Sequence, residues 1–229
     1  IETMDDGRAF VYHGGPDGLS DSPAWVAPRA PLGVSARFGI AVAAAGDVNG
    51  DGYGDVIIGA NGYDAEQTNE GAAFVYHGGP DGLSADPAWV VHPTDQAYAN
   101  FGRSVAAAGD VNGDGYGDVI IGAPWRARSK VDPRLDGAAY VYHGSSTGLR
   151  LTPAWTPREI FQNAQFGIAV AAAGDVNGDG YGDVAVGAFE YTAVLYQTPW
   201  REGAVFVYHG GPAGLNADAA NWRAVSGQE

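Results

Sequence analysis

One long segment, Val-Ala-Ala-Ala-Gly-Asp-Val-Asn-Gly-Asp-Gly-Tyr-Gly-Asp-Val, occurs three times in this chain, and its copies stand about 65 residues apart. The copies begin at Val42, Val105 and Val170. A second segment that ends in Val-Tyr-His-Gly occurs four times, beginning at Gly7, Gly71, Gly137 and Gly203. A tryptophan follows each of these, at Trp25, Trp89, Trp155 and Trp222. Self-similarity at a fixed period of this length predicts a repeat architecture.

Each repeat predicts four short strands, which we name a to d in chain order. In the first complete copy they are Ile40–Ala45, Val56–Gly59, Ala72–Tyr76 and a strand around Trp89. The runs are rich in Val, Ile and aromatic residues and are bounded by Gly, Asp and Pro. Strands a and b are nearly continuously apolar, so we expect both of their faces to be buried. An all-β fold follows, a β-propeller built of four-stranded antiparallel blades.

The number of hairpins predicts about three and a half blades. Four c–d hairpins are present but only three a–b hairpins, and the chain begins at a strand c. We therefore expect a single β-propeller region over 1–229, with a half blade in 1–37 and whole blades in 38–100, 101–165 and 166–229. Propellers close with four to eight blades. A second chain or a missing segment is expected to complete the ring, because open strand edges invite pairing.

The loop between strands a and b carries side-chain oxygens at its first, third, fifth and ninth positions, the donors that calcium prefers. The glycines between these residues permit a sharp turn. An EF-hand is excluded because its twelfth position requires Glu, and Ile58 stands there. An Asx-rich turn without metal is the simpler alternative, and magnesium fits less well than calcium. The predicted ligands of three calcium sites, including one main-chain carbonyl in each loop, are Asp47, Asn49, Asp51, Tyr53 and Asp55; Asp110, Asn112, Asp114, Tyr116 and Asp118; and Asp175, Asn177, Asp179, Tyr181 and Asp183.

These residues and their surroundings resemble the FG-GAP repeat of integrin α-chain propellers and their bacterial relatives. The second copy has the full signature, Phe101-Gly102 before strand a and Gly122-Ala123-Pro124 after strand b. The first copy has Asn61 in place of the Pro, and the third has Phe189. The resemblance implies a seven-bladed calcium-binding propeller, extracellular or on the cell surface, that acts in adhesion or ligand binding.

The b–c loops differ in length and sequence while everything around them repeats, and in repeat proteins such insertions lie on the binding face. Together with the d–a loops they hold eight of the 12 Lys and Arg residues, while nine of the 27 acids lie in the calcium loops. We expect an acidic protein or a glycan to bind there, although charged residues on solvated loops are a simpler explanation. The candidate ligand-binding residues are Trp125, Arg126, Arg128, Lys130, Tyr191, Trp200 and Arg201.

One histidine and one tryptophan recur in every repeat. Because His13, His77, His143 and His209 are one to a blade, we expect a structural hydrogen bond to a neighbouring turn rather than a shared metal site. The tryptophans are expected to pack between blades. The alternative is a sugar-binding platform repeated around the ring, as in propeller lectins.

Composition excludes several classes of function. The net charge of −15 opposes nucleic-acid binding, the absence of cysteine excludes disulfides and thiolate sites, and no apolar run is long enough to span a membrane. No phosphate loop, nucleophile elbow or zinc-protease motif is present, so we expect no enzyme. Three functions stay open: a calcium-stabilised extracellular adhesion module, a propeller lectin, and a purely structural domain of a larger secreted protein.

Overall fold

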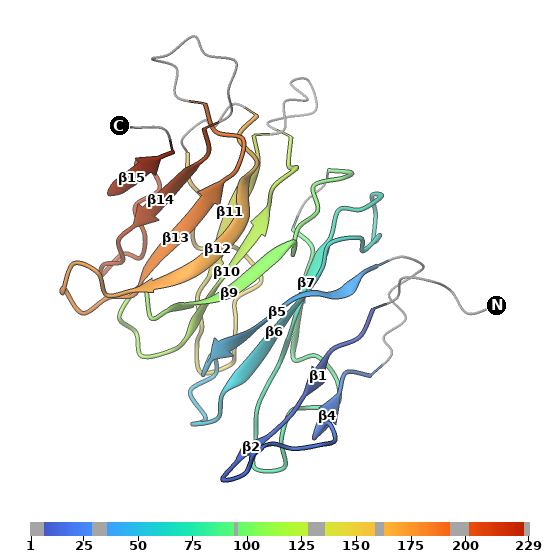
Figure 1. Ribbon diagram of the computed structural model, residues 1–229. Coiled ribbons are helices and arrows are strands. Elements are labelled where there is room, and N and C mark those ends of the chain that lie inside the picture. Colours follow the sequence, from blue (N-terminus) through green and yellow to red (C-terminus); the bar gives the residue numbers. More distant parts are fainter. Residues whose placement is uncertain are drawn as a thin grey trace.

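The computed structural model describes residues 7–28, 36–93, 96–127, 136–158, 163–192 and 202–226. Strands are the only regular elements in these ranges, and none of the ranges contains a long apolar helix that could cross a membrane. The sheets follow one another through space in chain order, from the blue N-terminal hairpins to the red final sheet (Figure 1). The all-β propeller architecture expected from the repeats is confirmed.

Two blades are complete four-stranded antiparallel sheets whose strands pair in chain order. The blade that begins at residue 38 contains β5 (Phe38–Gly46), β6 (Asp55–Ala60), β7 (Ala72–Tyr76) and β8 (Trp89–Val91). The blade that begins at residue 166 contains β12 (Phe166–Gly174), β13 (Asp183–Ala188), β14 (Ala204–Tyr208) and β15 (Trp222–Val225).

The other two units depart from four full strands. The blade that begins at residue 101 has β9 (Ser104–Gly109), β10 (Asp118–Ala123) and β11 (Ala138–Tyr142), and its strand d is reduced to a bridge between Val141 and Trp155. In the N-terminal unit β1 (Phe10–Val11) pairs with β4 (Trp25–Val26), and β2 (Gly14–Gly15) pairs with β3 (Gly18–Leu19).

The core lies between successive sheets. Ile57 and Val75 of one blade share a buried cluster with Ile121 and Tyr142 of the next. A second cluster joins the last two blades, and a third joins the N-terminal unit to the first complete blade. Strand β5 contacts β9, and β9 contacts β12, so the first strands of successive blades are neighbours. This is the arrangement of propeller blades around an axis.

The expectation that strands a and b are both buried on two faces is right for strand b of the blade that begins at residue 101 and wrong for strand a of the blade that begins at residue 38. Every residue of β10 is buried, whereas in β5 Ile40 is 43% exposed and Val42 is 58% exposed. Strand β5 forms the edge of its sheet, and its alternating burial indicates that only one face is covered. It also begins at Phe38 rather than Ile40, because a bulge between Phe38 and Ala41 lets the strand pair with β6 from its first residue.

Adjacent blades are joined where strand c of one blade meets the Phe-Gly of the next. Gly71 forms an isolated parallel bridge with Phe101, and Gly7 and Gly137 do the same with Phe38 and Phe166. A Cβ atom on Gly71 would collide with the carbonyl oxygen of Phe101. Gly71 also has a φ of 84°, so both the close approach and the backbone conformation require glycine.

Candidate calcium loops and ligand face

The candidate calcium loops lie between β5 and β6, β9 and β10, and β12 and β13, whereas the β6–β7 connection leaves the opposite end of its sheet (Figure 1). In the first loop the Asp47 carboxylate organises the turn. Its Oδ1 accepts hydrogen bonds from the backbone N–H groups of Gly50 (2.7 Å) and Asp51 (3.1 Å), and its Oδ2 accepts one from Gly52 (2.8 Å). The loop is therefore held closed by its first acid.

The middle of the loop is tied together by an amide and a second carboxylate. The Asn49 amide donates from Nδ2 to Oδ2 of Asp51 at 2.9 Å, and its Oδ1 accepts the Asp51 N–H at 3.1 Å. Oδ1 of Asp51 accepts the Tyr53 N–H at 2.9 Å. Donation from Tyr53 and Asn49 lowers the pKa of the Asp51 carboxyl, so it is ionised at neutral pH.

The last acid of the loop is buried. Asp55 is 1% exposed, and its two oxygens accept the N–H groups of Val48 and Gly78, both at 2.8 Å. Burial raises the pKa of the Asp55 carboxyl. Asp118, in the same position of the second loop, is fully buried, and burial raises its pKa to about 7. Two backbone hydrogen bonds therefore do not offset the loss of water around these carboxylates.

The same contacts recur in the second and third loops. The first acid of each accepts three backbone N–H groups, the Asn bonds to the third ligand residue, and the last acid bonds to the loop and to the end of strand c. Asp183 is buried as Asp55 and Asp118 are. In each loop the predicted side-chain ligands thus form one hydrogen-bonded turn, and that they bind a cation stays a prediction. Whether each tyrosine carbonyl faces a cation stays a prediction.

Within the described ranges, no three Asp, Glu or His side chains stand close enough together to hold a metal ion. The carboxylates bond to backbone N–H groups instead of converging on one point. The donor set nevertheless fits calcium, because hard oxygen ligands line each loop and one carboxylate of each is buried. A divalent cation would offset the cost of burying the charges of Asp55 and Asp118.

The candidate ligand face is only partly described. Arg128, Lys130, Trp200 and Arg201 lie outside the described residues. Trp125 and Arg126 are half-buried in the turn after β10. Tyr191 is held in place, because its hydroxyl accepts a 2.8 Å hydrogen bond from Arg223, whose guanidinium lies 5.6 Å from the tyrosine ring centre.

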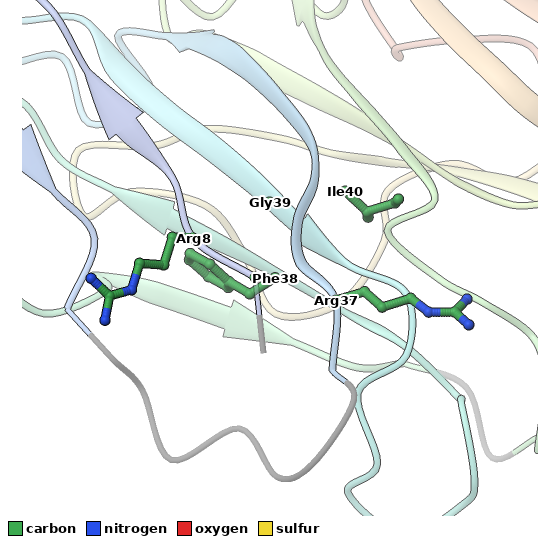
Figure 2. Close-up of a pocket in the computed structure, with 6 residues that line it drawn as sticks. Arg8, Arg37, Phe38, Gly39 and Ile40 are labelled. Carbon is green, nitrogen blue, oxygen red and sulfur yellow. The ribbon is translucent and has the colours of Figure 1, made fainter. Parts of the chain in front are cut away.

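An open cleft of about 410 Å³ lies on this same face, between the N-terminal unit and the start of β5. Figure 2 shows the exposed side chains of Arg8 and Arg37 extending to opposite sides of Phe38. Arg37 is one of the eight basic residues that the sequence places in the b–c and d–a loops, whereas Arg8 lies in a strand c segment and was not predicted to belong to this face. The signal was present, since the other repeats have Ala72, Ala138 and Ala204 in the position of Arg8.

Packing of the repeated tryptophans between blades is supported. Nε1 of Trp25, Trp89 and Trp155 donates to a main-chain carbonyl of the next blade, at 3.0–3.1 Å. Trp89 and Trp155 are nearly fully buried, so they offer no face to a sugar. The predicted histidine hydrogen bond appears at His77 and His143, whose Nδ1 atoms lie 3.3 and 3.2 Å from Nδ2 of Asn49 and Asn112.

Residues 38–76, 101–142 and 166–208 each match the FG-GAP repeat family, and together they make up more than half of the chain. The chain belongs to the FG-GAP family. Each matched segment runs from the Phe of the Phe-Gly pair through the calcium loop to the tyrosine that ends strand c. The FG-GAP resemblance drawn from the motifs is confirmed.

Integrin α chains are among the relatives of this FG-GAP chain. It is 37% identical to integrin alpha-4 of Xenopus laevis over 169 residues, which are 70% of this chain. It is 37% identical to integrin alpha pat-2 of Caenorhabditis elegans over 177 residues, and 33% identical to human integrin alpha-7 over 184 residues. These alignments cover 68% and 77% of this chain. The FG-GAP chain spans only 14–15% of the length of these relatives.

Proposed function

We propose that this FG-GAP chain is a calcium-stabilised, non-enzymatic binding module of an extracellular or cell-surface adhesion protein. The observation that carries the proposal is the threefold recurrence of one oxygen-rich loop, each ending in a buried carboxylate, at one place in integrin-like blades. Similarity to integrin α chains supports the adhesive role. When bound, calcium would supply positive charge that holds the strand a–b hairpin closed.

Calcium binding is tested by thermal unfolding in calcium and in a chelator. A ligand that binds only the folded state adds stability that grows with its free concentration, so the chelator should lower the melting temperature. Asp51→Ala should remove part of the calcium-dependent increase. Asp81→Ala is the matched control, because Asp81 is an exposed acid in a c–d turn. Equal melting temperatures in calcium and chelator would show that the loops are simple Asx turns.

The ligand is proposed to bind the face formed by the b–c and d–a loops. Arg8 and Arg37 flank a cleft on this face, and Arg126 lies in the turn after β10. Arginines beside aromatic side chains are common in recognition surfaces, which favours an acidic protein or an acidic glycan as the ligand. Binding should weaken in Arg8→Glu and Arg37→Glu, whereas Arg103→Glu, outside the cleft, should bind normally. A ligand whose affinity is unchanged by both cleft variants binds elsewhere.

The choice between protein and sugar needs a direct assay. Burial of Trp89 and Trp155 disfavours a sugar platform repeated once per blade. We therefore expect that a glycan array, with and without calcium, shows no sugar that binds at a site repeated in every blade. If neither a protein nor a glycan binds in any assay, the chain is better explained as a structural domain.

Completion of the ring by a further blade belongs to the same proposal. At the last blade a mainly apolar cleft of about 550 Å³ runs past Ile168, Phe189, Gly203 and Val225. In the preceding blades the equivalent glycines touch the next Phe-Gly, whereas a Cβ on Gly203 would meet nothing closer than 3.3 Å. The mass in solution tests this proposal. A monomer of 23.6 kDa would show that the chain does not complete its ring by self-association.

A further inference from the structure

The three calcium loops have identical sequences from first to last ligand but different surroundings. Each of the first two loops is covered by the blade that follows it in the chain. The N–H of Gly117 donates to the Asp47 carbonyl at 2.8 Å, and the N–H of Ser145 donates to the Val48 carbonyl at 3.1 Å. Gly182 and Gly211 make the same bonds to Asp110 and Val111. Val48 and Val111 are fully buried, whereas Val176 of the third loop is 56% exposed.

A histidine stands between each covered loop and the following blade. His77 follows strand c, and its Nδ1 lies 3.3 Å from Nδ2 of Asn49. The NH₂ group of the Asn49 amide can only donate hydrogen bonds, so Nδ1 of the His77 ring is the acceptor. On its other side the ring lies against Gly148 in the c–d turn of the next blade, where a Cβ would be 3.1 Å from Nε2. His143 stands in the same way between Asn112 and Gly214.

The two hydrogens of the Asn49 amide are both used, one by Asp51 and one by His77. The amide therefore cannot rotate without losing hydrogen bonds, and its Oδ1 stays turned toward the loop, where it accepts the Asp51 N–H. In the third loop Nδ2 of Asn177 bonds to Asp179, and no contact with His209 is found among the described residues. One of the two constraints on the amide is absent there.

The terminal units show that the contact needs both neighbours. His13 is followed by a blade but has no calcium loop beside it among the described residues. It is exposed, with nothing within 4 Å of the Cβ position of Gly82 in the next turn. His209 has a calcium loop, but no described turn follows it. Only His77 and His143 have both a loop and a following turn, and among the described residues only these two make the contact with Asn.

We propose that His77 and His143 are positioning residues that couple each calcium loop to the blade that follows it. The turn of the next blade fixes the imidazole, the imidazole fixes the Asn side chain, and the Asn oxygen is thereby presented to calcium. The coupling is reciprocal: if docking of the next blade raises the calcium affinity of the loop, calcium binding strengthens docking of that blade by the same free energy. The rings of His77 and His143 then raise the calcium affinity of the loops Asp47–Asp55 and Asp110–Asp118. This proposal rests on the calcium-binding function proposed above.

The experiment is a calcium titration of the metal-free, ¹⁵N-labelled 229-residue protein by nuclear magnetic resonance. The amide signals of Gly52, Gly115 and Gly180 report the three loops separately, since each glycine follows the third acidic or amide ligand of its loop. His77→Phe should weaken the first loop by roughly threefold to tenfold, the effect of one lost hydrogen bond, while the Gly115 and Gly180 signals titrate as before.

Two further variants separate positioning from general destabilisation. His77→Asn places an acceptor oxygen near the lost Nδ1 and should restore most of the affinity. His209→Phe is the matched control and should change none of the three loops. In the metal-free protein, His77→Phe should also shift the side-chain NH₂ signals of Asn49, a readout that needs no calcium.

The outcomes distinguish the two proposals. If no loop responds to calcium, the calcium function fails, and the positioning proposal fails with it. If the loops bind calcium but His77→Phe behaves like His209→Phe, calcium binding stands and the positioning role is overturned. Weakening of the first loop alone, with recovery in His77→Asn, supports the coupling.

Discussion

Nε1 of Trp89 donates a 3.1 Å hydrogen bond to the main-chain carbonyl of Arg150, 61 residues later in the next blade. The indole ring also meets the ring of Tyr142 edge to face, with 5.1 Å between ring centres. Trp25 and Trp155 make the equivalent bonds at their own junctions. Each tryptophan therefore both fills the interface between two blades and bonds across it.

Trp89→Phe should destabilise the protein by about 1–3 kcal/mol, because it removes the hydrogen bond to the Arg150 carbonyl and leaves a gap where the nearly fully buried indole packs. Urea unfolding followed by near-ultraviolet circular dichroism measures the change. Trp222→Phe is the matched control. Trp222 is 54% exposed, so its replacement should cost little. If the two variants lose the same free energy of unfolding, burial of the Trp89 indole between blades does not add to stability.

Gly71→Ala should be considerably more destabilising than Gly203→Ala. Both glycines have positive φ, 84° and 68°, so both substitutions strain the backbone by roughly 1–2 kcal/mol. Only Gly71 also has the Phe101 carbonyl in the way of a Cβ atom. The additional overpacking should cost about 1–3 kcal/mol. Thermal unfolding of the two variants side by side measures this difference, and equal melting temperatures would contradict the close approach of the blades.

Without calcium, stability should fall as the pH rises from about 4 to 7. Burial raises the pKa of Asp118 to about 7, whereas the unfolded chain loses this proton near its ordinary value of 3.8. Between these values the folded state holds more protons than the unfolded state, so the free energy of unfolding decreases as pH increases. Melting temperatures in a chelator across this pH range measure the slope.

Asp118→Asn should flatten that slope, because it removes the buried titrating group, while the exposed Asp81→Asn should keep it. Calcium should oppose the trend in the unsubstituted protein, since the cation favours the ionised carboxylate. If Asp118→Asn leaves the slope in the chelator unchanged, this carboxyl does not control the pH dependence.

Much of the local structure could be predicted because its causes are local. Strand c was predicted as Ala72–Tyr76 and β7 has these bounds. The loop Asp47–Asp55 connects two strands as expected, since its acids and glycines set up their own turn through hydrogen bonds that span only a few residues. The FG-GAP family was recognisable for the same reason, as its signature residues are close together in the chain.

Features that depend on a neighbouring blade could not be read from the repeats. Strand a was expected to be buried on both faces, but Val42 of β5 is 58% exposed. Val105, at the same position of β9, is only 8% exposed because it packs against Ala41 and Ala43 of β5 in the preceding blade, whereas no described strand a precedes β5. The cleft that carries Arg8 and Arg37 also escaped prediction, since it is formed by two segments that meet only in the fold.

The calcium loops show which features the sequence determined and which the tertiary structure decided. The sequence alone determined the repeat, the strands and the oxygen ligands, because an Asp or Asn side chain bonds to the backbone beside it wherever the segment occurs. Only the tertiary structure decided that Val48 is fully buried and Val176 is 56% exposed, although the two stand in identical loops. The physical reason is that burial, and with it the contact between His77 and Asn49, is supplied by the next blade rather than by the loop itself.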